Sequence, residues 1–127
     1  MMSLTRRNTP RLAAIAVLAW GLPGWAHHSH GNYDLRQYID MEGTVTEVHW
    51  INPHTWIYME VVDEGGIATI WTLEGGGINA LTRRGWAEDS VQVGDNVSVR
   101  CHPLRAGTPV CLFGFLRTED GYENEFD

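Results

Sequence analysis

The residues of this sequence with the clearest chemistry are its histidines, because imidazole is the commonest protein ligand for late first-row transition metals. Copper(II) has the highest affinity for such ligands among the divalent metals of that row. Three histidines lie close together near residue 30, and three are spread through the rest of the chain: His27, His28, His30, His49, His54 and His102. The histidines therefore predict a copper site wherever the fold brings several of them together.

Residues 1–26 have the pattern of a cleaved export signal. An arginine-rich start is followed by an apolar run at residues 12–22, which is too short to span a bilayer. Gly24 and Ala26 provide the small residues that a signal peptidase needs for a cut after Ala26. The paired arginines lack the apolar residue usual in a twin-arginine signal, so we expect the general secretory route. We expect a periplasmic or secreted protein that is not inserted in a membrane.

Cleavage there would place a free α-amino group beside His27. A terminal histidine binds a metal through its amine and one ring nitrogen in a six-membered chelate, and His28 could support that chelate. This arrangement resembles the histidine brace of copper monooxygenases, but those enzymes have a different fold and no catalytic partner is visible here. The simple amino-terminal copper motif has histidine third, where this chain has Ser29. The alternative is a processing site that precedes a disordered start and binds nothing.

The part of the chain after residue 26 is strongly acidic. Its 101 residues contain six arginines, no lysine and all 16 acidic residues, a net charge of −10 with neutral histidines. That length makes one domain with one modest core, which we expect to be a monomer. The charge repels phosphate backbones and anionic lipid, so we expect no nucleic acid partner, whereas cations are attracted. The alternative is that the charge serves solubility alone.

Alternating apolar residues and turn signals predict five strands and one short helix. The predicted strands are at 41–50, 55–62, 67–73, 96–102 and 110–118, with the helix at 78–84. This order is typical of a five-stranded Greek-key barrel, the OB-fold, and the alternative is an open β-sandwich. The all-β domain is expected at 40–118, between a flexible histidine-rich segment at 27–39 and an acidic tail at 119–127.

Cys101 and Cys111 are the two cysteines of the chain, and they fall in the last two predicted strands. A pair of cysteines in an oxidising compartment can form a disulfide, and the short turn between these strands makes a cross-strand bond geometrically feasible. Two cysteines alone do not fix a pairing. A pair of buried thiols and a pair of soft copper ligands are the alternatives.

The barrel topology predicts a second cluster of histidines. In an OB-fold, the loop between the first two strands and the loop between the last two flank one binding face. One of these loops carries His54, and the other lies beside His102 and contains Arg105, so we expect the two histidines to approach each other. The terminal histidines could complete a three- or four-nitrogen site there. The alternative for His54 is structural, because a histidine after Asn-Pro commonly ties a turn.

Residues near these loops are further candidates for the ligand face: Trp50, Asn52, Trp56, Glu74 and Arg105. The tryptophans at 50, 56, 71 and 86 form a stacking platform for a ring or sugar in one interpretation and fill a small barrel in the other. The glycines after Glu74 allow close approach by a helix, a ligand or a partner. His49 is expected on the exposed face of the first strand and is left out of the metal set.

Three short motifs resemble those of a known family. They are Trp50-Ile51-Asn52-Pro53-His54-Thr55-Trp56, Leu73-Glu74-Gly75-Gly76 and Arg83-Arg84-Gly85-Trp86. With the Ala-His-His at the end of the signal, they resemble a domain-of-unknown-function family of small exported bacterial proteins. The resemblance covers nearly all of the chain after residue 26. It implies a fold and a compartment but no activity, since fold alone does not determine function.

Common enzyme signatures are missing from the sequence, which has no Gly-x-Ser-x-Gly, His-Glu-x-x-His or phosphate-binding glycine loop. We therefore expect a binding module rather than an enzyme, with copper as the first ligand to test. The alternative is an accessory domain that docks on a partner protein and binds no metal. A small copper-dependent oxidase or monooxygenase is the third and weakest hypothesis.

Overall fold

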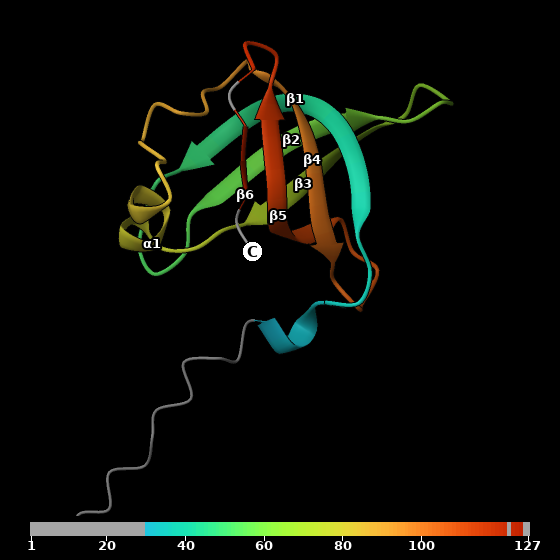
Figure 1. Cartoon of the computed structure of the whole chain (residues 1–127). Helices are drawn as coiled ribbons and strands as arrows, with labels where there is room; N and C mark the ends of the chain where they lie inside the picture. Colours follow the sequence, from blue (N-terminus) through green and yellow to red (C-terminus); the bar gives the residue numbers. More distant parts are fainter. Residues whose placement is uncertain (1–29, 122, 126–127) are drawn as a thin grey trace, which may run out of the picture.

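The computed structural model describes residues 30–121 and 123–125 (Figure 1). The elements are η1 (a 3₁₀ turn) His30–Asn32, β1 Ile39–His49, β2 Trp56–Val62, β3 Ala68–Glu74, α1 Ile78–Arg83, β4 Asn96–Pro103, β5 Val110–Thr118 and β6 Glu123–Glu125. Each strand predicted from the sequence is present within two residues of its expected bounds. Within the described residues, no helix is long and apolar enough to cross a membrane.

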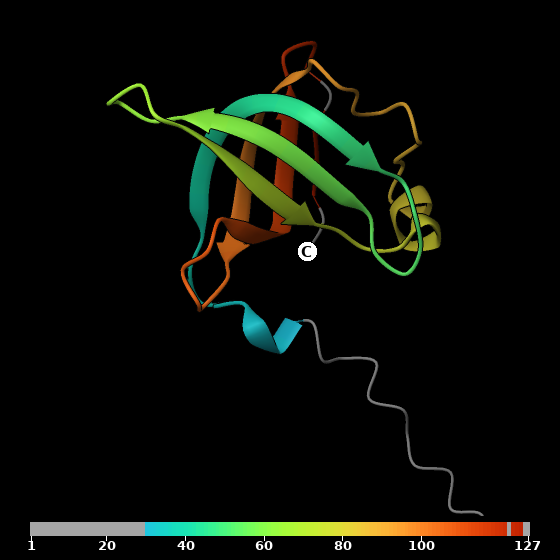
Figure 2. The same ribbon diagram turned by 180° about the vertical axis from the view of Figure 1, so that it is seen from behind.

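Strands β1 to β5 close into a barrel (Figures 1 and 2). Antiparallel pairing joins β1 to β2 and to β4, β2 to β3, and β4 to β5. The barrel closes where residues 72–74 of β3 pair in parallel with residues 110–112 of β5. This closing pair excludes the open sandwich and confirms the five-stranded barrel with one short helix that the strand order predicts.

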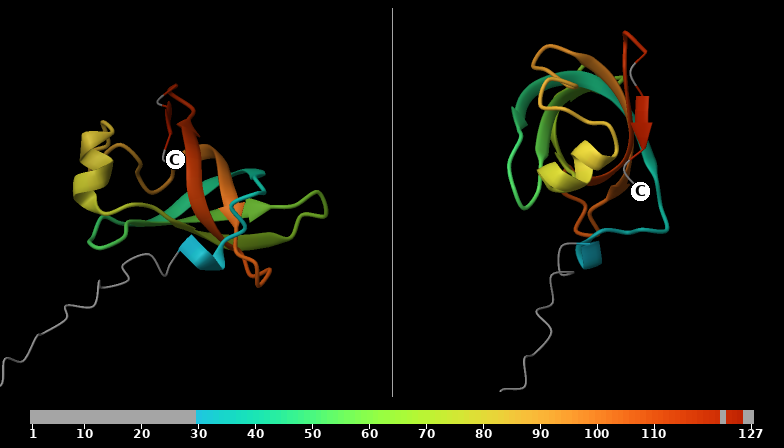
Figure 3. Two further views of the ribbon diagram at one scale, coloured as in Figure 1. Left: turned by 60° about the horizontal axis from the view of Figure 1, so that its bottom comes forward. Right: turned by 60° about the vertical axis from the view of Figure 1, so that its left-hand side comes forward.

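Apolar side chains from the barrel strands fill its interior, because alternate residues of a strand face the same side. Met59, Leu73 and Leu116 are fully buried there. The helix α1 lies across one end of the barrel (Figure 3), where Leu81 from the helix and Trp86 after it join the core. Of the two interpretations of the tryptophans, core packing therefore holds for Trp86.

The segment before β1 differs from the flexible stretch expected at 27–39. Tyr33 is buried and forms a single β-bridge with Leu104. Arg105 donates from Nε to the carbonyl of Tyr33 and from its backbone N–H to the carbonyl of Asn32, both at 3.0 Å. This part of the segment is therefore fixed to the β4–β5 loop. A sequence pattern does not show such contacts, because their partners lie 72 residues apart in the chain.

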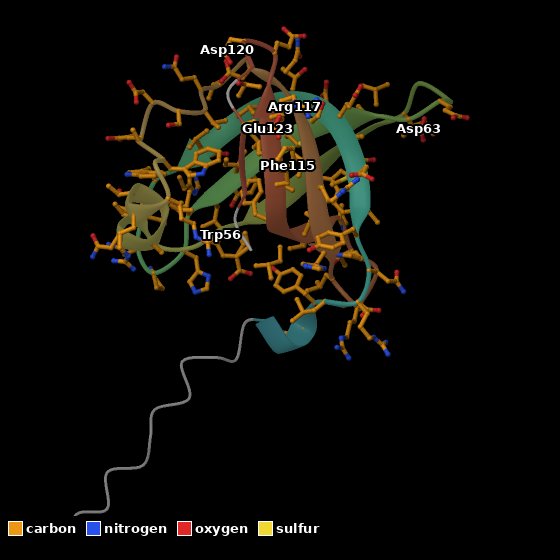
Figure 4. The ribbon with its side chains drawn as sticks, viewed as in Figure 1. Trp56, Asp63, Phe115, Arg117, Asp120 and Glu123 are labelled. Carbon is orange, nitrogen blue, oxygen red and sulfur yellow. A yellow bond between two sulfur atoms is a disulfide. The ribbon has the colours of Figure 1, made fainter. Side chains whose placement is uncertain are left out.

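The acidic tail expected at 119–127 contains part of the sheet. β6 pairs antiparallel with β5, and the guanidinium of Arg117 donates to the carboxylate of Glu123 at 2.9 Å (Figure 4). β6 covers the edge of β5 beyond its short pairing with β3. The tail therefore extends the sheet beyond the five barrel strands.

Cys101 of β4 and Cys111 of β5 form a disulfide, and their Cα atoms are 5.7 Å apart. The two cysteines are not directly opposite, because Cys101 pairs with Phe113 and Cys111 with Pro103. The bond therefore runs diagonally between the two strands. Both cysteines are fully buried in the core.

Candidate functional site

The Trp-x-Asn-Pro-His turn and the glycine run meet at the end of the barrel that α1 covers. Thr55 donates its backbone N–H to the carbonyl of Gly76 at 3.1 Å and accepts the N–H of Gly75 at 2.8 Å. Oδ1 of Asn52 accepts the N–H of Ile78 at 2.9 Å, which pairs a backbone donor in the first turn of α1. Asn52, a candidate for the ligand face, therefore has a structural role in holding the turn against α1.

Gly77 permits this close contact between the turn and the helix. A Cβ atom at Gly77 would lie 2.7 Å from the carbonyl oxygen of Pro53 and 2.9 Å from Oδ1 of Asn52. Any side chain there would push the turn away from α1. The group that approaches the glycine run is thus the turn at residues 50–55, in which the Asn52–Pro53 peptide bond is cis.

The turn places His54 against Glu74, the last residue of β3. Nδ1 of His54 contacts Oε1 of Glu74, and this contact is an ion pair when the ring is protonated, although the ring is not aligned for a hydrogen bond. The other carboxylate oxygen, Oε2, accepts a hydrogen bond from the hydroxyl of Tyr33. Glu74 is only 4% exposed. One buried carboxylate therefore joins three segments of the chain: the stretch before β1, the β1–β2 turn and the end of β3.

The surroundings of Tyr33, His54 and Glu74 determine which of their atoms are available for chemistry. Burial, followed by the hydrogen bond to Glu74 and its negative charge, raises the pKa of the Tyr33 hydroxyl, so Tyr33 keeps its proton at neutral pH. The His54 side chain is 27% exposed, and its ring is stacked with that of Trp56, with centroids 6.3 Å apart. Because Nδ1 faces the carboxylate, Nε2 is the nitrogen of His54 left for a ligand.

A cavity of about 450 Å³ opens beside Glu74. The segment before β1, the glycine run, α1 and the ends of β4 and β5 form its walls, with polar groups from Glu74, Arg84 and His102 and apolar groups that include Leu35 and Phe113. Its volume lies in the range of small-molecule sites, and its wall is mainly apolar.

His102 lies at the same end of the barrel but in different contacts. Leu112 of β5 pairs with both Glu74 and His102, so two strand spacings, about 10 Å, separate their backbones. The ring of His102 packs on Tyr38 with centroids 4.1 Å apart, and its Nδ1 donates to the carbonyl of Gln37 at 2.7 Å. These contacts, with an exposure of 5%, make His102 an anchor for the segment before β1.

The other candidates have separate places in the structure. Trp50 is partly buried against the core. His49 is half-buried, contacts the carboxylate of Glu47 and meets Tyr58 edge-on. Arg105 holds the segment before β1, as described above. The predicted ligands at positions 27 and 28 lie outside the described residues, and His30 begins η1.

Among the described residues, no group of three or more histidine, cysteine, aspartate or glutamate side chains is arranged to hold a metal ion. His54 and Glu74 form a pair only. Any metal site built on His54 would need ligands from outside the described residues.

Tyr33 is the residue of this site that the sequence pattern does not predict. It precedes Glu74 by 41 residues, in a segment that was expected to be flexible. The available signal was the alternation of Tyr33 and Leu35 with polar residues, a pattern that predicts a segment with one covered face. Two apolar residues are too few to distinguish such a segment from a polar loop, and of the two only Tyr33 is buried, since Leu35 is 50% exposed.

Comparison with known proteins places the chain in a family. No curated protein matches it. Residues 14–113 match the model of a protein family described as a family of unknown function, DUF6152, and the matched region includes the turn, the glycine run and the helix that build this site. The chain therefore belongs to the DUF6152 family.

Proposed function

We propose that this protein is an exported small β-barrel that binds copper(II), with His54 as the ligand that the barrel supplies. One observation carries the proposal: the buried carboxylate of Glu74 lies against Nδ1 of His54 and is itself held by Tyr33. Metal-binding histidines commonly direct their other ring nitrogen to a carboxylate, which orients the ring and raises the basicity of the ligating nitrogen. Glu74 is suited to this role and leaves Nε2 for the metal.

The contacts of the three barrel histidines favour His54 as the metal ligand. His102 is buried under Tyr38 and donates to a backbone carbonyl. His49 also contacts a glutamate, but the side chain of Glu47 is 59% exposed and gives the ring no rigid support. Of these three histidines, His54 alone combines a buried carboxylate partner with partial exposure.

One imidazole is too few ligands for tight copper binding, so the proposal requires further nitrogens. The sequence supplies them at the terminus that cleavage after Ala26 would create: the α-amino group and the rings of His27 and His28, with His30 nearby. Added to His54, they would make the three- or four-nitrogen set that suits copper(II). The acidic charge of residues 27–127 would raise the local concentration of cations.

Export belongs to the same proposal. Residues 1–26 have the pattern of a signal peptide. The Cys101–Cys111 bond supports an oxidising compartment, because structural disulfides are rare in the cytosol. The intact mass of the protein recovered from the periplasm tests this step, and we expect a chain that begins at His27. A chain that retains residues 1–26, or that begins elsewhere, would remove the terminal amine from the site.

Copper(II) titration of the processed protein, followed by calorimetry and electron paramagnetic resonance, tests the metal site. His54→Ala is expected to weaken binding by at least about tenfold and to remove one nitrogen from the copper spectrum, with the barrel still folded. His49→Ala is the matched control, because it removes another histidine that contacts a glutamate, and it should leave binding unchanged. Binding should also weaken below about pH 6, because imidazole must lose its proton to ligate.

Removal of residues 27–30 separates the two halves of the site. If this truncation abolishes binding while His54→Ala has no effect, the site is a terminal chelate and the barrel takes no part. If neither change alters binding, the metal hypothesis is wrong. The accessory docking domain is then the better description of the protein.

A further inference from the structure

The β2–β3 hairpin extends beyond the body of the barrel (Figures 1 and 3). β3 pairs with β2 along its whole length but with β5 only through residues 72–74. On the side away from β2, residues 68–71 have no strand partner within the described part of the chain. The matching edge of β5 is covered by β6 at residues 115–117. The structure therefore leaves one of these two edges open.

The backbone of this open edge can accept another strand. Thr72 donates its N–H to the carbonyl of Pro109 at 3.0 Å, so the backbone groups of Thr72 point away from β2. Because N–H and C=O directions alternate along a strand, those of Ile70 and Ala68 point to the same side. That side is the open edge. Two residues thus present a donor and an acceptor each, spaced as in a sheet.

The side chains along this edge do not protect it. Natural edge strands are commonly blocked by charged residues, proline or a covering loop. Residues 67–73 contain no charged residue and no proline. Ile67 is 66% exposed, Ile70 46%, and Val62 on the neighbouring strand 57%. An open edge with apolar side chains is suited to strand addition by an extended peptide.

The acidic charge of the hairpin favours a basic partner segment over a second copy of this chain as the occupant of this edge. Glu60, Asp63 and Glu64 are exposed on the hairpin, with Asp63 in its tip (Figure 4), and residues 60–74 contain no lysine or arginine. A second copy of this chain carries the same acidic hairpin and the same net charge of −10 over residues 27–127, which opposes self-pairing. We propose that the free edge of β3 binds an extended segment of a partner protein, with an apolar centre and basic flanks, as an added strand. This proposal does not depend on copper binding.

The register of β2 and β3 indicates which side chains the added segment needs. Ile70 pairs with Glu60 across β2 and β3, so both side chains lie on one face of the hairpin. A residue beside Ile70 on the added strand lies on that face, where an apolar side chain packs on Ile70. Basic residues further along the added strand come near Asp63 and Glu64 at the tip. The apolar centre therefore matches the edge, and the basic flanks match the turn.

Nuclear magnetic resonance with a defined peptide tests the proposal on the disulfide-bonded protein. The probe is acetyl-Arg-Arg-Val-Thr-Val-Arg-Arg-amide, which has basic residues at both ends and so fits either strand direction. We expect the amide signals of Ala68 and Ile70 to shift and to become protected from hydrogen exchange. The same peptide with both valines N-methylated keeps its charge but loses backbone donors, and should bind at least about tenfold more weakly. A peptide with glutamate in place of arginine should not bind.

Substitutions at the open edge of β3 test the same proposal independently of the peptide variants. Ile70→Pro removes one N–H at the open edge and leaves the β2 ladder intact, so it should weaken peptide binding by about tenfold. Ala68→Pro repeats the test at the second position if Ile70→Pro does not fold. Val93→Ala changes another exposed apolar residue, which lies before β4 and away from this edge, and should have no effect. Equal binding of the N-methylated peptide would overturn the proposal. So would self-association of the protein that Ile70→Pro abolishes, because a second copy would then occupy the edge.

Discussion

The hydroxyl of Tyr33 donates a hydrogen bond to Oε2 of Glu74 and joins the segment before β1 to the end of β3. Tyr33 is 3% exposed and Glu74 is 4% exposed. A buried carboxylate is tolerated where polar partners replace the water it has lost. Tyr33 and His54 are those partners. The segment before β1 is therefore part of the candidate site.

Tyr33→Phe removes the donor and keeps most of the packing. We expect the free energy of unfolding to fall by about 1–3 kcal/mol, because a buried charged acceptor loses its hydrogen bond. Urea denaturation at pH 7 with the disulfide intact measures the change. Tyr58→Phe is the control, since the Tyr58 hydroxyl makes no hydrogen bond to the described residues, and its effect should stay within about 0.5 kcal/mol. Equal losses in both variants would contradict the role of Tyr33.

Alkaline pH tests the same hydrogen bond in another way. Burial and the Glu74 carboxylate raise the pKa of Tyr33 above the value near 10 of an unfolded tyrosine. As pH rises past about 10, the unfolded chain releases this proton first. The stability that protonated Tyr33 gives the folded state is therefore present below that pH and is lost above it. The slope from this one group approaches about 1.4 kcal/mol per pH unit. Denaturation curves from pH 8 to 11 should therefore be less pH-dependent in Tyr33→Phe than in Tyr58→Phe.

Gly77→Ala tests the contact between the Asn-Pro turn and α1. The added Cβ atom would lie 2.7 Å from the carbonyl oxygen of Pro53, a backbone atom that cannot rotate away. We expect a loss of about 1–3 kcal/mol in the free energy of unfolding. Gly76→Ala is the matched control, because its Cβ atom would meet only side-chain atoms, the Cβ of Ala80 at 3.4 Å and Cδ2 of Leu81 at 3.9 Å. If the two variants unfold at the same temperature, the turn does not press on the glycine run.

Local signals were sufficient for the strands, the helix and their order, but not for the register between strands. Each strand has its own alternation of apolar residues, and the glycine run interrupts that pattern before the helix, so element types and order follow from neighbouring residues. The diagonal register of Cys101 and Cys111 depends on a bulge near Arg100 that no composition signal marks. The covering of β5 by β6 depends on a strand of three residues, which is too short to show a period.

The candidate site was only partly predictable for the same reason. His54 and Glu74 stood out by residue type and by the turn and glycine signals around them. Their contact depends on the turn, whose shape is set by Asn52 and by the space at Gly77. His102 is predicted to lie near His54. In the structure, however, β5 lies between β4, which carries His102, and the end of β3, where Glu74 contacts His54. Such long-range positions follow from strand register, which one sequence does not determine.

The disulfide is expected to stabilise both the core and the candidate site, and its removal tests this. Cys101 and Cys111 are ten residues apart and fully buried, so the double variant Cys101→Ala/Cys111→Ala loses both a cross-link and core packing. We expect the free energy of unfolding to fall by about 2–5 kcal/mol in urea denaturation. Wild-type protein in excess reductant should lose most of the same amount.

The loop between the two cysteines also holds Tyr33, through the bridge to Leu104 and the hydrogen bond from Arg105. Without the cross-link this loop has more freedom, so backbone amides near Tyr33 should exchange with solvent faster in the double variant, under conditions where the barrel stays folded. Hydrogen exchange followed by mass spectrometry measures this, with amides of the β2–β3 hairpin as the internal control. Unchanged exchange near Tyr33 would mean that the bond to Glu74 holds the segment without support from the disulfide.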